Sequence, residues 1–99
     1  MADGKLSDQD IKAGLAIRPG WRHEGDAIVR EFTFKSFPDA IAFTTRLAFE
    51  AEAADHHPDL AISYKRVTVR WSTHSAGGVT EKDLSGATQA DTVAGAFLK

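Results

Sequence analysis

Two adjacent histidines followed by a proline, His56, His57 and Pro58, have the most distinctive chemistry in this 99-residue chain. The chain contains only four histidines in all and no cysteine. Imidazole can give or take a proton near neutral pH, because its unperturbed pKa is about 6.5. Proline disfavours a helical conformation in the residue before it, so we expect a helix to end here and both rings to line one wall of a cleft.

Two further groups are placed to act with this pair. Glu52 lies four residues before His56, and in a helix such a carboxylate can accept a ring N–H and hold the imidazole in one tautomer. His74 lies at the predicted end of a strand, before a loop that contains two glycines. Side chains at such positions often face a ligand. Three imidazoles are therefore expected to converge.

Other interpretations of the same residues stay open at this point. Histidines at the end of a surface helix are favoured by the helix dipole without any catalytic role. Asp83 follows Thr80 by three residues and is explained as a helix cap. A metal site of His56, His57 and His74 is a third alternative. The chain has no His-x-His or His-x-x-x-His spacing, and contiguous histidines rarely bind one ion, so we expect no metal.

The helices that must position these residues are marked by start signals of one kind. A Ser or Thr followed three residues later by Asp occurs at 7–10, 36–39 and 80–83, which predicts helices over roughly 7–17, 37–55 and 80–97. In the middle helix, spacings of three and four predict one buried stripe. Its members are Ala40, Phe43, Leu47, Ala51 and Ala54.

Between the helices the hydrophobic period changes to two. Residues 26–35 and 66–74 alternate as half-buried strands do, and a short strand is expected around 62–64. Gly25, just before the first of these strands, indicates a hairpin with residues 21–23. The order α-β-β-α-β-β-α predicts an α+β fold, with a roughly four-stranded antiparallel sheet and three helices on one face. Residues 1–99 are expected to form a single domain.

Composition excludes several classes of protein. Twelve basic and 14 acidic side chains leave no positive field for a phosphate backbone, so direct nucleic-acid binding is not expected. The absence of cysteine excludes a disulfide framework and thiolate chemistry. No apolar stretch suits a signal peptide or a membrane span. We therefore expect a cytoplasmic protein that does not bind membranes.

Taken together, these features resemble the pterin-4a-carbinolamine dehydratase family. The resemblance depends on the pattern ExxxHHP at 52–58, on Ser-Thr-His at 72–74, and on Asp83 nine residues after the third histidine. It extends upstream through the Gly-Trp pair at 20–21 and the central helix, and covers about residues 20–95. Family members usually carry an aromatic residue two positions after the proline. This chain has Leu60 there, which puts an aromatic contact at the cleft rim in question.

The resemblance implies a cofactor-free dehydratase that removes water from 4a-hydroxytetrahydrobiopterin and so supports tetrahydrobiopterin recycling. Carried over position by position, His56 and His74 would be the acid and base, and His57 would bind or orient the pterin. Glu52 would orient His56. The other substrate-binding residues that it implies are Asp55, Pro58, Ser72, Thr73, Ser75 and Asp83. A homodimer or homotetramer is expected, as in family members.

Other functions compete with this one. In animals the family is also known as a dimerisation cofactor of a homeodomain transcription factor, which works through protein contacts. The chain would then be an interaction module. A metal-binding protein is a further alternative, and a dehydratase could act on another pterin, such as a molybdopterin-related species. Pterin turnover without added metal would separate an enzyme from the first two.

Overall fold

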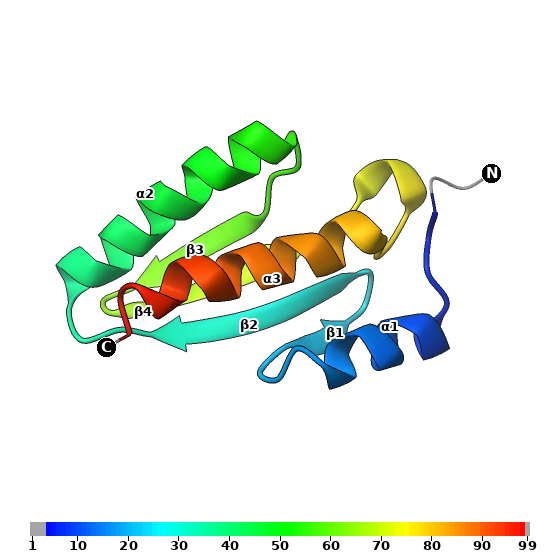
Figure 1. Cartoon of the computed structure of the whole chain (residues 1–99), viewed down its shortest axis with the longest axis horizontal. Coiled ribbons are helices and arrows are strands. Elements are labelled where there is room, and N and C mark those ends of the chain that lie inside the picture. Colours follow the sequence, from blue (N-terminus) through cyan, green and yellow to red (C-terminus); the bar gives the residue numbers. More distant parts are fainter. Residues whose placement is uncertain (1–3, 99) are drawn as a thin grey trace.

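A computed structural model describes residues 4–98 of the chain (Figure 1). Its elements, in chain order, are α1 (Asp8–Ala16), β1 (Arg22–Glu24), β2 (Ala27–Thr33), α2 (Phe37–Ala54), β3 (Asp59–Ser63), β4 (Arg66–Trp71), a short 3₁₀ helix η1 (His74–Ala76) and α3 (Glu81–Gly95). This order confirms the predicted α+β fold. None of the helices within residues 4–98 is long and apolar enough to cross a membrane.

The four strands form one antiparallel sheet in the order β1-β2-β4-β3. Helices α2 and α3 pack against each other and against β4, while α1 lies beside β1 (Figure 1). Alternate residues of the two central strands are buried beneath the helices, as the period of two predicts. These residues are Ile28, Phe32, Val67, Val69 and Trp71.

All three predicted helix starts are confirmed by a hydrogen bond across the first turn. The bonds run from Asp10 N–H to Ser7 Oγ, from Asp39 N–H to Ser36 Oγ, and from Thr80 N–H to the Asp83 carboxylate. Each polar side chain thus satisfies a backbone group that the helix leaves free. The signal is local, which is why the sequence locates these starts so closely.

Three details of the second half differ from prediction. β3 spans Asp59–Ser63 rather than 62–64, and Tyr64, with φ of 54°, belongs to the turn that follows. β4 ends at Trp71 and does not reach His74, because the chain turns into η1. Ala54 is exposed rather than part of the buried stripe of α2, since it borders an open cavity between α2 and α3.

Candidate active site

The end of α2 determines where the two adjacent histidines lie. Asp55, directly after the helix, has a left-handed backbone with φ of 53°. The His56 N–H donates to the Ala51 carbonyl at 3.1 Å, and the Asp55 N–H donates to the Glu52 carbonyl at 3.1 Å. Helices commonly end on a left-handed residue in this way, and Asp adopts that conformation more readily than most residues. The chain therefore changes direction at Asp55.

A buried carboxylate of α3 holds the His56 ring. His56 Nε2 lies 2.6 Å from Asp83 Oδ1, and Asp83 is completely buried. The other carboxylate oxygen accepts hydrogen bonds of 2.8 Å from the Thr73 hydroxyl and 2.8 Å from the Thr80 N–H. Three donors therefore fix the carboxylate in one orientation. Asp83 is the helix cap that the sequence indicates and also the partner of His56.

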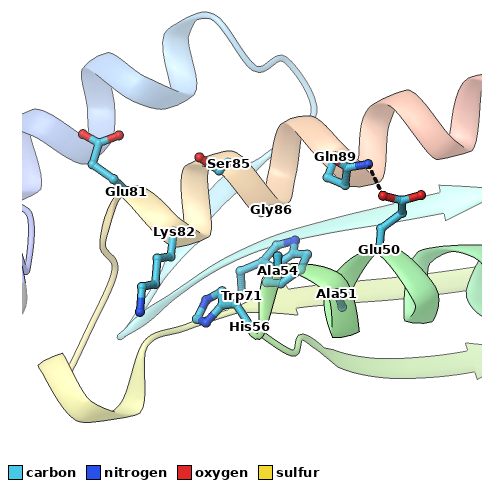
Figure 2. Close-up of a pocket in the computed structure, with 10 residues that line it drawn as sticks. All are labelled: Glu50, Ala51, Ala54, His56, Trp71, Glu81, Lys82, Ser85, Gly86 and Gln89. Atoms are coloured by element: carbon cyan, nitrogen blue, oxygen red, sulfur yellow. Dashed lines mark hydrogen bonds between the residues drawn. The ribbon is translucent and has the colours of Figure 1, made fainter.

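The orientation of His56 leaves one ring nitrogen available for chemistry. A neutral imidazole that donates from Nε2 to a carboxylate has its lone pair on Nδ1. The ring also stacks on Trp71, with centroids 5.4 Å apart and planes at 14°, and Figure 2 shows the two side by side. The His56 side chain is only 14% exposed. His56 is therefore held in one orientation by Asp83 and Trp71 and is largely buried.

Glu52 contacts His57 and not His56, so the predicted pairing of Glu52 with His56 is wrong. His57 Nε2 lies 2.8 Å from Glu52 Oε1, and both side chains are exposed. The prediction assumed helical geometry as far as His56. The left-handed residue Asp55 breaks that geometry and turns His56 toward α3, which brings the next residue back over Glu52.

A polar cleft of about 420 Å³ brings the three histidines together. Its lining residues are Asp55, His56, His57, Ser72, Thr73, His74, Ser75 and Lys82. The histidines come from the end of α2 and from the start of η1, where His74 is exposed. The Ser72 hydroxyl donates to the Asp26 carbonyl at 2.7 Å, so its lone pairs are left to accept a bond from a ligand.

Three of the residues singled out from the sequence do not line the cleft. Asp83 lies behind His56, Glu52 supports His57 at the rim, and Pro58 follows the pair in a half-buried position. Leu60 packs against the core from β3.

Lys82 is the cleft residue that sequence reasoning missed. It lies in the first turn of α3, next to Asp83. A signal for it existed, because a cation in the first turn of a helix is electrostatically unfavourable and is seldom placed there without a reason. Among the residues that line the cleft, Lys82 is the only lysine, and there is no arginine.

Among residues 4–98, no three His, Asp or Glu side chains are grouped so that they could hold a metal ion. His56 Nε2 and His57 Nε2 instead bond separate carboxylates, those of Asp83 and Glu52. Each of these two histidines therefore has one ring nitrogen engaged by a carboxylate.

A solved structure of similar fold defines the class of protein. The transcriptional coactivator/pterin dehydratase from Brucella melitensis superposes with a TM-score of 0.89 at 36% sequence identity, covering 92% of this chain and 99% of that one. A pterin dehydratase-like protein, identified as a RuBisCO assembly factor of the alpha-carboxysome, has a TM-score of 0.67 at 24% identity and covers 77% of this chain and 90% of that one. The second likeness shows the fold alone. The class is that of pterin-dehydratase-like α+β domains.

The family follows from sequence comparison. The family model for pterin 4 alpha carbinolamine dehydratase matches residues 4–93. A curated relative from Thermosynechococcus vestitus is 54% identical over 80 residues, which are 81% of this chain and 84% of that one. Another from Chloroflexus aurantiacus is 50% identical over 91 residues, 92% of this chain and 98% of that one. Both are named as candidate pterin-4-alpha-carbinolamine dehydratases. The chain belongs to the pterin 4 alpha carbinolamine dehydratase family.

Proposed function

We propose that this protein is a cytoplasmic dehydratase that converts 4a-hydroxytetrahydrobiopterin to quinonoid dihydropterin and water, in support of tetrahydrobiopterin recycling. The bond between C4a and oxygen breaks, and a proton donor protonates the departing oxygen so that water leaves. N5 loses its proton as the double bond between C4a and N5 forms. No oxidant or reductant is needed, so a donor and an acceptor of protons suffice.

The observation that carries the proposal is the His56–Asp83 contact of 2.6 Å beside a cleft that His57 and His74 also line. His56 and His74 serve as the acid and the base, since imidazole can fill either role near neutral pH. His57, held by Glu52, binds or orients the pterin.

The polar edge of the pterin is expected to meet the other residues of the cleft. Ser72 can accept a bond from a ring N–H, because its own hydrogen is engaged by the Asp26 carbonyl. Asp55 and Ser75 also line the cleft, and Thr73 reaches it while bonding Asp83. Pro58 supports the turn that presents the two histidines.

Turnover of 4a-hydroxytetrahydrobiopterin by the purified full chain tests the proposal. Formation of the quinonoid product should exceed the spontaneous rate in proportion to enzyme concentration, and preincubation with a chelator should leave that rate unchanged. A rate equal to the spontaneous one would contradict the proposed reaction. Loss of activity on chelation would contradict the metal-free mechanism.

A protein-interaction role is the second candidate, and the surface of α2 favours it. Phe37, Ile41 and Phe49 are 48%, 38% and 70% exposed on this helix. Apolar side chains gathered on one element mark an association surface more often than isolated ones do. A variant that loses dehydration but keeps partner or self-association would show that the two roles use separate surfaces.

A further inference from the structure

The loop that carries His74, residues 73–78, is closed at its base by two backbone hydrogen bonds. The Thr73 N–H donates to the Gly78 carbonyl at 2.9 Å, and the Gly78 N–H donates to the Thr73 carbonyl at 3.3 Å. Within the loop, the Gly77 N–H donates to the His74 carbonyl at 3.0 Å, and Gly77 has a left-handed backbone with φ of 72°. The His74 loop is therefore a compact unit whose orientation is set at its base.

His74 depends on this backbone for its position. Its side chain is exposed, and its imidazole has no hydrogen-bond partner among residues 4–98. His56 and His57 differ in this respect, because a carboxylate holds each of them. The contacts that orient the base of the His74 loop therefore also determine where the His74 ring lies in the cleft.

The N-terminal segment, residues 4–7, supports the base of the loop (Figure 1). The Leu6 N–H donates to the Val79 carbonyl at 2.8 Å, directly after the pair that closes the loop. A Cβ atom on Gly78 would lie 3.0 Å from Lys5 Cε, so the stem of Lys5 lies on the Gly78 backbone. The Leu6 side chain packs against the core. The segment is thus anchored to the fold on one side and to the loop on the other.

The loop has little other support on this side. Gly77 and Gly78 face a hollow of about 160 Å³, whose other walls include Gly25 and Asp26 from the turn between β1 and β2. The loop is therefore not packed against that turn at this point. Among the backbone hydrogen bonds of residues 74–79 in the described chain, the bond from Leu6 is the only one to a partner outside residues 73–79.

We propose that the N-terminal segment is a positioning element for His74, and that its Leu6 N–H holds the loop in the orientation that keeps the imidazole in the polar cleft. This inference rests on the proposed dehydratase function. Neither Lys5 nor Leu6 lines the polar cleft, so the segment acts through His74 and not on the pterin. A reacting group misplaced by about 1 Å can cost about 10²-fold in rate. One hydrogen bond at the base of the loop is therefore sufficient to change turnover.

Leu6→Pro is the test, because proline lacks the N–H that the Val79 carbonyl accepts. Leu6→Ala is its matched control, since it removes the packing of the side chain and keeps the N–H. Leu6→Pro should lower kcat about 10- to 100-fold and leave KM unchanged, because the pterin-binding residues stay in place. Leu6→Ala should keep the wild-type kcat. All proteins are assayed below their melting temperatures, so that unfolding does not enter the rate.

The same changes in a His74→Ala background identify the route of the effect. Leu6→Pro should cause no further loss there, because the group that it positions is absent. Enzyme concentrations are chosen to keep the His74→Ala rate above the spontaneous one. A loss as large as that in the wild-type background would mean that the segment acts on Asp83 or on the whole fold, and this would overturn the inference. Equal kcat values for Leu6→Pro and Leu6→Ala would also overturn it.

Hydrogen exchange reports on the loop without any substrate. The Thr73 and Gly78 amides should exchange faster in Leu6→Pro than in Leu6→Ala, because their bonds close a loop that has lost its support. The His56 amide, bonded to the Ala51 carbonyl, should exchange equally in both. Unchanged exchange at the loop would overturn the inference and leave the proposed function intact. If the wild type dehydrates no 4a-hydroxypterin, the proposed function fails instead, and exchange still decides whether Leu6 holds the loop.

Discussion

At the scale of single residues, the site depends on a network of hydrogen bonds that converges on the Asp83 carboxylate, the partner of His56. Thr73 gives its one hydroxyl hydrogen to Asp83, so the Thr80 hydroxyl, 2.8 Å away, must donate to Thr73. Thr80 Oγ1 in turn accepts from the Lys82 N–H at 3.2 Å. The first turn of α3 thus sets the orientation of the Asp83 carboxylate and, through it, the tautomer of His56.

Asp83→Asn should leave the packing intact and remove most of the activity. The single amide oxygen would bond the two donors from Thr73 and Thr80, which leaves the NH₂ group facing His56 Nε2. His56 would then carry its proton on the wrong nitrogen. We expect kcat to fall about 10²- to 10⁴-fold, the usual worth of an acid or base, and unfolding to become easier by about 1 to 3 kcal/mol.

Asp91→Asn provides the matched control. Asp91 accepts hydrogen bonds from Trp21 at 3.0 Å and from Arg30 at 2.9 Å, and it lines neither the polar cleft nor the cavity between α2 and α3. Its substitution should lower the melting temperature with kcat within about twofold of wild type. Equal losses of kcat in both variants would mean that Asp83 acts only through stability. Steady-state kinetics and calorimetric melting measure the two effects separately.

At the scale of elements, the contact of α3 with β4 fixes Trp71, the ring on which His56 stacks. Gly86→Ala should destabilise the fold by about 1 to 3 kcal/mol, because the added methyl overpacks against Trp71, and it should weaken the His56 stack on that ring. Gly95→Ala is the control, since nothing lies within 4 Å of a Cβ there. It should stabilise α3 by about 0.5 to 1 kcal/mol. Chemical denaturation of both variants checks the sign; a stable Gly86→Ala protein would contradict the packing.

The helices could be predicted because their start signals are local in the sequence. The site could be predicted only in part, because contacts between residues distant in the sequence determine it. The capping residue Ser36 and its target lie within one turn, so sequence spacing is sufficient to locate that helix start. The bond from His56 to Asp83 spans 27 residues, and only the packing of α3 beside α2 brings the two together. The left-handed backbone at Asp55 could not be predicted from the sequence, because the residue is not a glycine. This one conformation places His57, and not His56, beside Glu52.

At the scale of the whole molecule, three of the exposed large apolar side chains lie on α2 and one lies on edge strand β3. The uncovered face of the sheet bears ion pairs instead, among them Arg70 with Asp26 at 2.9 Å. Phe49 is 70% exposed on α2, and Ile62 is 39% exposed on β3, whose outer edge is unpaired within residues 4–98. An apolar helix and an open edge are both surfaces that self-association covers.

We therefore expect a homodimer or homotetramer in solution. Light scattering at micromolar concentration should give a mass of two or four chains. Phe49→Asp should shift the mass toward one chain, because it places a charge on the proposed contact. Ile17→Asp, at a position 77% exposed beyond α1, should leave the mass unchanged. A single-chain mass for the wild type would contradict the expectation.

The most direct test of metal-free histidine catalysis is the turnover of 4a-hydroxytetrahydrobiopterin by His56→Ala, His74→Ala and the double variant, with a chelator present throughout. Each single variant should lose about 10²- to 10⁴-fold in kcat, equivalent to about 3 to 5 kcal/mol in the barrier. The double variant should lose less than the sum if both groups serve one proton-transfer event. His74→Ala should melt like the wild type, since His74 is exposed and outside the core. Retention of more than half the wild-type turnover by His74→Ala would contradict the acid–base assignment.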